Sequence, residues 1–340
     1  MSRRLEIFKG FRIDVTALFT RCMPTSIFII VFLLFGLTSP RFLQPESLLN
    51  IAKQASYIGI AALGMTLVLI TGGVDLSLGS TVYLSTIVAG LLMRDYGMSP
   101  VAASFVCLLA GAGIGGFNAF FITRFKILPF VVTLATMIAG RGLGLLLTKS
   151  RALEFPAVIL KVGGFKLFGF LPLPILLFAL SATAIQLFLS RIPLGRHYYA
   201  VGFNAENARR AGLPVDRIIA SAYVLCGICA SLGGLVAVTQ LGIVNAGFGK
   251  GDEFDAIAAA VLGGAALSGG VGSAFPGTVI GALMIRMIWS GLVSAKINLY
   301  FQPMIFAVIL FLAVMLDTRR NMIIARQRRK IISLRKDKQT

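Results

Sequence analysis

Ionisable side chains inside the apolar stretches of this 340-residue chain are few, and they are the residues best placed to do chemistry. Asp75 lies in the segment GGVDLSLGS, and Asp255 opens an apolar run just after two other acidic residues. Arg141 and Arg286 lie inside two further apolar runs. If these runs cross a membrane, each buried charge costs about 2.5–3.5 kcal/mol. Such groups therefore face a cavity or a partner, or they mark a break in a helix.

Broken helices are predicted around several of these positions. Glycines on both sides of Asp75 predict an interrupted backbone, in which Asp75 and Ser77 cap the helix that follows. Direct contact of Asp75 with a transported solute is the alternative. Asp255 suits the N-terminus of a helix. Gly269 and Gly270 break another apolar stretch, and a discontinuous span can expose backbone dipoles to a polar solute.

The chain lacks the common nucleotide, metal and nucleophile motifs. It has no G-x-x-x-x-G-K-[ST], no H-E-x-x-H and no G-x-S-x-G, and its only histidine lies in a polar segment. Cys226 and Cys229 lie one helical turn apart inside an apolar run, where we interpret them as small packing residues. We therefore expect no catalytic residue, no metal and no cofactor. Asn118, also inside an apolar run, is expected to hydrogen bond to a neighbouring helix.

The composition predicts an all-α polytopic membrane protein. Hydrophobic residues make up 57% of the chain and charged residues only 13%, against about 25% charged residues in soluble domains. With about 20 residues needed for each span, the apolar runs predict about ten transmembrane helices, several of them short or discontinuous. The expected spans are residues 24–38, 54–70, 80–93, 101–122, 128–147, 172–189, 218–239, 254–267, 275–293 and 300–316.

A long polar segment, residues 191–217, separates the sixth and seventh expected spans. Within it, the sequence predicts a short helix that Asn204 caps at its N-terminus and Gly212 ends, with Arg209 and Arg210 in the last turn. A short capped helix that projects from a membrane protein suits a soluble partner. The alternative is an ordinary basic loop that only sets the orientation of the chain.

The distribution of basic residues predicts the orientation. Most of the 32 lysines and arginines fall in segments that a ten-span chain with an internal N-terminus places in the cytoplasm. We expect a basic cytoplasmic segment 1–23, a transmembrane domain 24–317 and a basic cytoplasmic tail 318–340. The protein then crosses the membrane several times and has both termini in the cytoplasm. We attribute the net charge of +19 to contact with membrane lipid, and not to nucleic acid.

Glycines spaced four residues apart mark expected helix contacts, because two small residues on one face let helix backbones approach closely. The pairs are Gly111 with Gly115, Gly140 with Gly144, and Gly277 with Gly281.

Four segments carry a resemblance to a known family. The chain resembles the permease subunits of ribose-type sugar ABC importers, and the resemblance runs from the second expected span to the tenth. The segments are GMTLVLITGGVDLSLGS (64–80), FVVTLATMIAGRGL (130–143), AVGFNAENARRAGL (200–213), and DEFDAIAAAVLGGAALSGGVGS (252–273) followed by GTVIGAL (277–283).

The resemblance implies a fold similar to the vitamin B12-type importer permease and a transport subunit that is not itself an enzyme. It also implies a multi-pass protein of the bacterial cytoplasmic (inner) membrane. It implies three partners: a second permease copy or paralogue, an ATPase subunit with two cassettes, and a periplasmic or surface sugar-binding protein. It also implies which residues couple the permease to the ATPase, namely Arg196, Asn204, Ala208, Arg209, Arg210 and Gly212.

Two other classes of function stay open at this point. A self-sufficient secondary carrier for a small polar solute would need intramembrane carboxylates for coupling and would transport without an ATPase. An intramembrane enzyme would need a nucleophile beside a base, and the chain shows no such pair.

Overall fold

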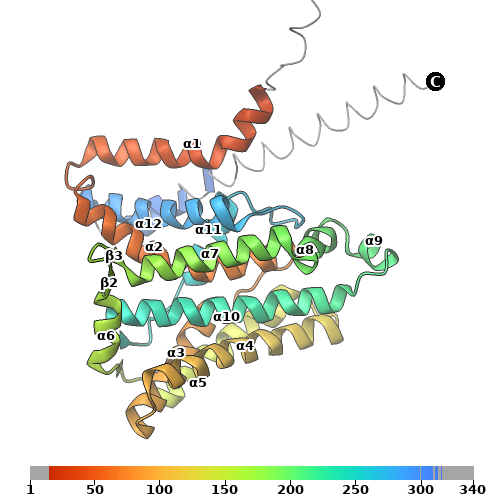
Figure 1. The fold of residues 1–340 in the computed structure, drawn as a ribbon, viewed down its shortest axis with the longest axis horizontal. Coiled ribbons are helices and arrows are strands. Elements are labelled where there is room, and N and C mark those ends of the chain that lie inside the picture. Colours follow the sequence, from red (N-terminus) through yellow and green to blue (C-terminus); the bar gives the residue numbers. More distant parts are fainter. Residues whose placement is uncertain (1–14, 299, 309–310, 313–314, 316–340) are drawn as a thin grey trace, which may run out of the picture.

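The computed structural model describes residues 15–298, 300–308, 311–312 and 315, and helices running side by side dominate it (Figure 1). The expected basic segment 1–23 is described only from Val15, where α1 begins, and the expected tail 318–340 lies outside the described residues. The helices are α1 (Val15–Thr38), α2 (Pro45–Ile70), α3 (Leu78–Tyr96), α4 (Pro100–Arg124), α5 (Pro129–Thr148), α6 (Ala157–Gly164), α7 (Leu173–Arg191), α8 (Pro193–Phe203), α9 (Ala205–Arg210), α10 (Val215–Leu241), α11 (Asp252–Leu262), η1 (Ala274–Thr278) and α12 (Val279–Ser294).

Among the described residues, six helices are long and apolar enough to cross a membrane. They are α2, α4, α5, α7, α10 and the unit Ala274–Ser294, which η1 and α12 form with a kink at Phe275. The other expected spans also contain helices, but each of these helices is either too short or not apolar enough to be counted with the six. α3 has 19 residues, α11 has only 11, and the last expected span contains a helix over 302–308.

α2 and α10 form the centre of the bundle. α10 packs along α4 and α2, and α2 also contacts α7, α11 and α12. The second half of α2 is buried continuously from Ile58 to Ile70, as expected of a helix that is apolar on every side. α5 and α7 lie at the edge, where large apolar side chains such as Ile138 and Leu180 are exposed.

The predicted glycine pairs all lie at helix contacts. A Cβ atom on any of these glycines would come within about 3 Å of a neighbouring element, so only glycine permits the observed approach. The facing residues are Gly227 and Tyr223 for the first pair, Ser80 and Tyr83 for the second, and Gly263 and Ala259 for the third. Cys226 and Cys229 pack against Gly64 of α2, which confirms that they are packing residues.

Short strands and irregular segments join the helices. β1 (Leu153–Glu154) pairs antiparallel with β4 (Ile243–Val244), and β2 (Lys166–Leu167) pairs antiparallel with β3 (Leu171–Pro172). α8 and α9 lie at one end of the bundle, on the right of Figure 1, and α6 with the β2–β3 hairpin lies at the other. We call these the α9 end and the α6 end.

Candidate functional site

The segment 191–217 occupies the α9 end, where it forms two helices (Figure 1). α8 follows α7 directly, and α9 projects beyond the rest of the bundle. Asn204 separates the two helices, and its Oδ1 accepts a hydrogen bond from the backbone N–H of Asn207 at 2.8 Å. This contact satisfies one of the free N–H groups at the start of α9. The predicted N-cap is therefore confirmed.

Gly212 ends α9 with a local hydrogen-bonding motif. Its φ of +82° lies in the left-handed region, which glycine adopts without strain. The Gly212 N–H donates to the Arg209 carbonyl at 2.9 Å, and the Leu213 N–H donates to the Ala208 carbonyl at 3.0 Å. These two bonds form a Schellman motif that satisfies the last carbonyls of the helix. The predicted stop at Gly212 is confirmed.

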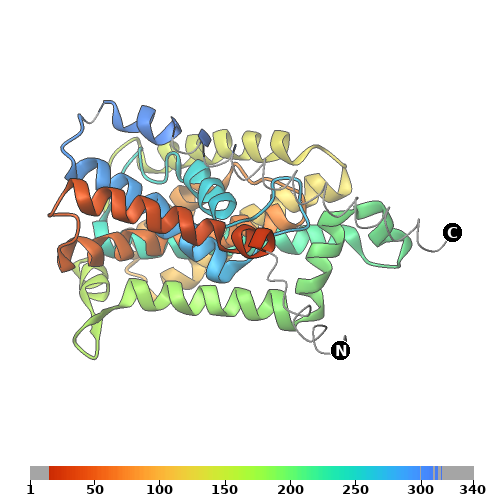
Figure 2. The same cartoon turned by 90° about the horizontal axis from the view of Figure 1, so that it is seen from above.

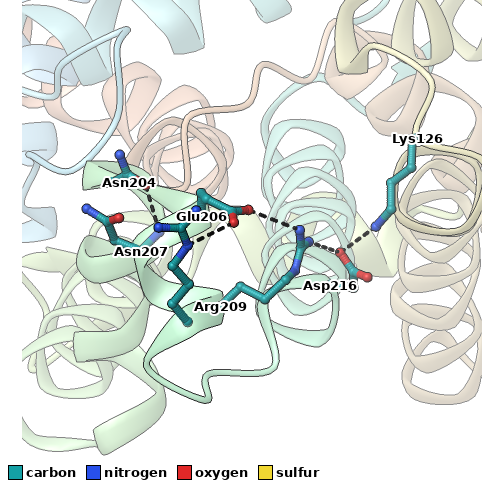
Figure 3. Close-up of polar contacts among 7 residues, drawn as sticks. Lys126, Asn204, Glu206, Asn207, Arg209 and Asp216 are labelled. Atoms are coloured by element: carbon teal, nitrogen blue, oxygen red, sulfur yellow. Dashed lines mark hydrogen bonds and ion pairs between the residues drawn. The ribbon is translucent and has the colours of Figure 1, made fainter.

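Charged side chains tie α9 to α10 and to the turn between α4 and α5 (Figure 3). Asp216, in the first turn of α10, accepts hydrogen bonds from Lys126 Nζ at 2.6 Å and from Arg209 Nη2 at 3.4 Å. Glu206 lies 3.8 Å from Arg209 and 3.2 Å from Arg210. All five side chains are more than half exposed, so each pair contributes on the order of 0.5 kcal/mol. The network orients α9 and adds little to overall stability.

The outer surface of this end carries exposed cations and an exposed aromatic ring. Arg196 on α8 and Arg210 on α9 are exposed, and Phe203, at the end of α8, is 85% exposed. Ala208, in contrast, is buried and packs α9 against the hydrophobic core. Arginine and aromatic residues are enriched at protein interfaces. These exposed side chains therefore suit a protein partner that offers carboxylates and an apolar surface.

Two tyrosines fix α8 to its surroundings. The buried Tyr198 ring packs edge-on against Phe188, with ring centroids 5.4 Å apart, and its hydroxyl shares a 2.7 Å hydrogen bond with Ser221 Oγ. Burial raises the pKa of Tyr198 to about 12, so this hydroxyl stays protonated at physiological pH. Tyr199 donates a hydrogen bond to the Gly272 carbonyl at 2.9 Å. α8 is thus attached to α7, to α10 and to the loop before η1.

Close backbone contacts join α8 to the end of α2, at a place we call the glycine junction (Gly72, Gly202, Gly269, Gly270 and Ile70). A Cβ atom on Gly202 would collide with the Ile70 carbonyl oxygen and lie 2.6 Å from the Gly270 nitrogen. The Gly270 N–H donates to that carbonyl at 2.9 Å. A Cβ atom on Gly269 would lie 2.7 Å from the Gly202 oxygen and 2.9 Å from the Gly72 Cα. The junction therefore puts Gly269 and Gly270 against the segment that carries α9.

Asp75, Ser77 and Asn118 belong to one hydrogen-bonded chain. Ser77 donates to Asp75 Oδ1 from its backbone nitrogen at 2.9 Å and from its hydroxyl at 2.6 Å. Asn118 Nδ2 donates to Ser77 Oγ at 2.8 Å, and Thr136 Oγ1 donates to Asn118 Oδ1 at 2.6 Å. The chain joins segment 71–77 to α4 and α5. The predicted interhelical hydrogen bond of Asn118 is confirmed.

The predicted capping of α3 is wrong in its detail. Ser77 stands at the N-cap position, but its side chain makes no capping hydrogen bond. Its hydroxyl is engaged instead by Asp75 and Asn118, and the second of these lies 41 residues away in the sequence. Asp75 itself is 2% exposed, so in this conformation it does not reach a solute.

Replacing Asn118 with leucine is expected to lower the free energy of unfolding by about 1–3 kcal/mol, because Ser77 and Thr136 then lose a buried partner. Thermal unfolding of the detergent-solubilised protein measures the effect. Thr183→Val is the matched control, since the Thr183 hydroxyl bonds only to its own helix at an exposed position. Equal melting temperatures for Asn118→Leu and the unsubstituted protein would contradict the prediction.

Asp255, Arg286 and Arg141 each have a partner among the described residues. Asp255 lies in the first turn of α11, as predicted, and its Oδ2 accepts a hydrogen bond from Arg286 Nη2 of α12 at 3.0 Å. Asp252 lies 4.0 Å from the same nitrogen, and the Arg286 guanidinium lies 5.0 Å from the centre of the Tyr57 ring. Arg141 donates to the Phe248 carbonyl at 2.5 Å. Within the described part of the chain, no group of three or more His, Cys, Asp or Glu residues could hold a metal ion.

Comparison with known families decides the class of protein. The family model for the permease component of branched-chain amino acid transport systems matches residues 47–316. The chain belongs to this permease family. The match begins two residues inside α2, runs through α12 and includes the whole of segment 191–217.

Curated relatives of this permease align over most of its length. The ribose import permease protein of Bacillus subtilis (strain 168) is 35% identical over 302 residues, which are 87% of this chain and 91% of the relative. The ribose import permease protein of Escherichia coli (strain K12) is 34% identical, over 83% of this chain and 89% of the relative. The autoinducer 2 import system permease protein of Photorhabdus laumondii is 36% identical, over 80% and 83%. The resemblance drawn from the sequence motifs is confirmed. No solved structure matches the permease.

The residues that the sequence predicts to be functional lie in separate parts of the permease. The α9 residues lie on the helix pair at one end, Gly269 and Gly270 lie in the glycine junction beneath it, and Asp255 lies in the cluster with Arg286. Sequence reasoning missed α8 and Gly202. Two features of the sequence indicate this helix: a proline at its first position, and the aromatic and apolar residues Tyr198 and Val201, three residues apart, which the structure buries.

Proposed function

We propose that the chain is the transmembrane permease subunit of an ATP-binding-cassette importer that moves a monosaccharide or a related small polar solute into the cytoplasm. Family membership and two ribose import permeases among the relatives support the proposal. ATP hydrolysis takes place on ATPase subunits with two cassettes, and a periplasmic or surface sugar-binding protein delivers the solute. The fold is then a ten-helix bundle of the vitamin B12 importer type, which pairs with a second permease copy or paralogue in the inner membrane.

The observation that carries this proposal is that α9 is a short helix capped at both termini. Both termini of α9 are capped by contacts within 204–213, so the helix keeps its shape when a partner pushes on it. We place this end and both chain termini in the cytoplasm, because its segments are rich in arginine and lysine. The exposed Arg196, Arg210 and Phe203 then face the ATPase.

Transport follows from motion of this end. ATP binding closes the two cassettes and displaces α9, and α8 moves with it because only Asn204 separates the two helices. The glycine junction passes the displacement to the end of α2 and to the loop before η1. Segment 71–77, with Asp75 and Ser77, follows α2 directly and repositions against Asn118. A cavity between two permease copies opens or closes as a result.

Reconstitution tests the proposal against the secondary carrier. Vesicles that contain this permease, its ATPase and the binding protein should accumulate the sugar only when ATP is present on the cytoplasmic side. Vesicles with the permease alone should accumulate none. Uphill accumulation by the permease alone would overturn the proposal in favour of the carrier.

Removing the two exposed cations, in the double variant Arg196→Ala/Arg210→Ala, is expected to reduce uptake about tenfold, since interface arginines often contribute 1 kcal/mol or more. Neither side chain packs in the core, so the amount of protein in the membrane should not change. Co-purification of the ATPase and ATP-driven uptake are the measurements. Arg94→Ala/Arg151→Ala, at the α6 end, is the matched control and should transport normally. Normal ATPase binding by the first double variant would show that these cations are not part of the interface.

A further inference from the structure

An exposed aromatic surface lies at the α6 end, far from the helices that engage the ATPase. It consists of α6 and the β2–β3 hairpin that follows (Figure 1). Phe168 and Phe170 stand at the hairpin tip, 82% and 71% exposed, with their rings stacked at a centroid distance of 6.4 Å. Phe165 is 54% exposed. A contiguous apolar patch of this kind on a protein surface marks an interaction site.

The surface is held in place by α10. Gly163 of α6 contacts the Thr239 carbonyl so closely that a Cβ atom would not fit, and Ile159 is buried on the same side. Val158 and Leu160, the residues before and after Ile159, are each 45% exposed. The hairpin is closed by paired backbone bonds and by the Leu173 N–H, which donates to the Phe165 carbonyl at 3.0 Å. The exposed rings are therefore on a fixed support.

Two features indicate what this surface touches. The hairpin leads directly into α7, whose Leu180 and Leu187 are more than half exposed, and it stands beside α7 at the rim of the bundle (Figure 2). Residues 157–173 contain two lysines, Lys161 and Lys166, and no acidic residue. Exposed apolar and aromatic side chains with lysines are the composition of segments that lie in the interface of an anionic bilayer. A soluble partner that binds only transiently would leave these phenylalanine rings exposed to water each time it dissociates.

We propose that α6 and the β2–β3 hairpin form an interfacial anchor, in which Phe168 and Phe170 enter the headgroup region of the outer leaflet and Lys161 and Lys166 contact lipid phosphates. The anchor continues the lipid-facing surface of α7 around the end of the bundle. It fixes the height of α7 in the membrane while α8, at the other end of α7, is moved. The choice of the outer leaflet rests on the proposed function, which places the α9 end in the cytoplasm.

A tryptophan at the hairpin tip tests the anchor in vesicles of phosphatidylcholine and phosphatidylglycerol. The single native tryptophan is first replaced as Trp289→Phe, which keeps the ring stack on Phe306 and removes a buried Nε1 that has no hydrogen-bond partner among the described residues. Phe168→Trp is then added. Its emission should be quenched by lipids that carry a nitroxide at the headgroup, and iodide should quench it about fivefold less than free N-acetyl-tryptophanamide, as for a side chain 5–10 Å inside the boundary. Leu180→Trp in the same background is the reference for a position deep in the bilayer.

Each outcome of the quenching experiment decides a different point. Full quenching of Phe168→Trp by iodide, with none by headgroup nitroxide, would overturn the anchor. Protection from iodide only after the binding protein is added would also overturn it, and would make the hairpin a docking surface. Quenching by a nitroxide lipid confined to the inner leaflet would keep the anchor but contradict the orientation in the proposed function.

Discussion

Substitution of Gly202 by valine is expected to reduce sugar uptake roughly a hundredfold while the permease still binds its ATPase. The added side chain would collide with backbone atoms of Ile70 and Gly270, and neither can rotate away as a flexible side chain could. Overpacking of this kind typically costs 1–3 kcal/mol, and here the strain relaxes by moving the end of α8 away from α2. ATP hydrolysis should continue, because the outer surface of α9 is unchanged.

Uptake and ATP hydrolysis in reconstituted vesicles measure the separation of the two activities. Gly142→Ala is the matched control, since Gly142 is also inside a helix but has no atom within 4 Å of the added Cβ position. It should transport normally. Gly202→Ala gives a smaller collision at the same place and should fall between the two. Coupled transport by Gly202→Val at the normal rate would show that displacement does not pass through the glycine junction.

Substitution of Arg286 by methionine is expected to remove most of the folded permease from the membrane. Arg286 is 12% exposed at its side chain and is the cation that faces both Asp252 and Asp255. Removing one partner of a buried ion pair costs about 3–5 kcal/mol, because the remaining charge is left without compensation. In this cluster two carboxylates would be left near the ring of Tyr57.

The amount of folded protein follows from size-exclusion chromatography of a fluorescent fusion and from its melting temperature. Arg94→Met is the matched control, because Arg94 pairs with Asp95 on the surface and its loss should change neither measurement. Arg286→Lys keeps the charge and should recover part of the folded population. The triple variant Arg286→Met/Asp252→Asn/Asp255→Asn removes the opposing charges together and should also be recovered in part. Normal levels of Arg286→Met would contradict the role of the cluster in holding α11 to α12.

Features that depend on neighbours in the sequence could be predicted, and α9 is the clearest example. Its cap at Asn204 and its stop at Gly212 use contacts between residues three to five positions apart, which the sequence displays directly. The glycine pairs were predictable for a related reason, since a spacing of four residues puts both members on one helix face. Neither inference requires knowledge of the neighbouring helix.

Features that depend on distant residues could not be predicted. The partner of Asp255 is 31 residues away, and the partner of Ser77 is 41 residues away, so nothing local connects them. Gly202 is inside a helix, and its importance comes from Ile70 and Gly270, which lie far from it in the sequence. The number of spans was also poorly determined, because half-length helices such as α11 are stabilised by packing inside the bundle and not by their own length.

The self-contained caps of α9 have a consequence for how these transporters diversify. The hydrogen bonds that shape this helix begin and end within ten consecutive residues, so the piece can be exchanged between paralogues without remaking its scaffold. A chimera that receives another permease's residues 193–213, and with them the positions of Arg196 and Phe203, should inherit that donor's choice of motor protein and keep its own cargo. Recruitment of a new motor thus requires no change in the membrane-embedded part of the chain.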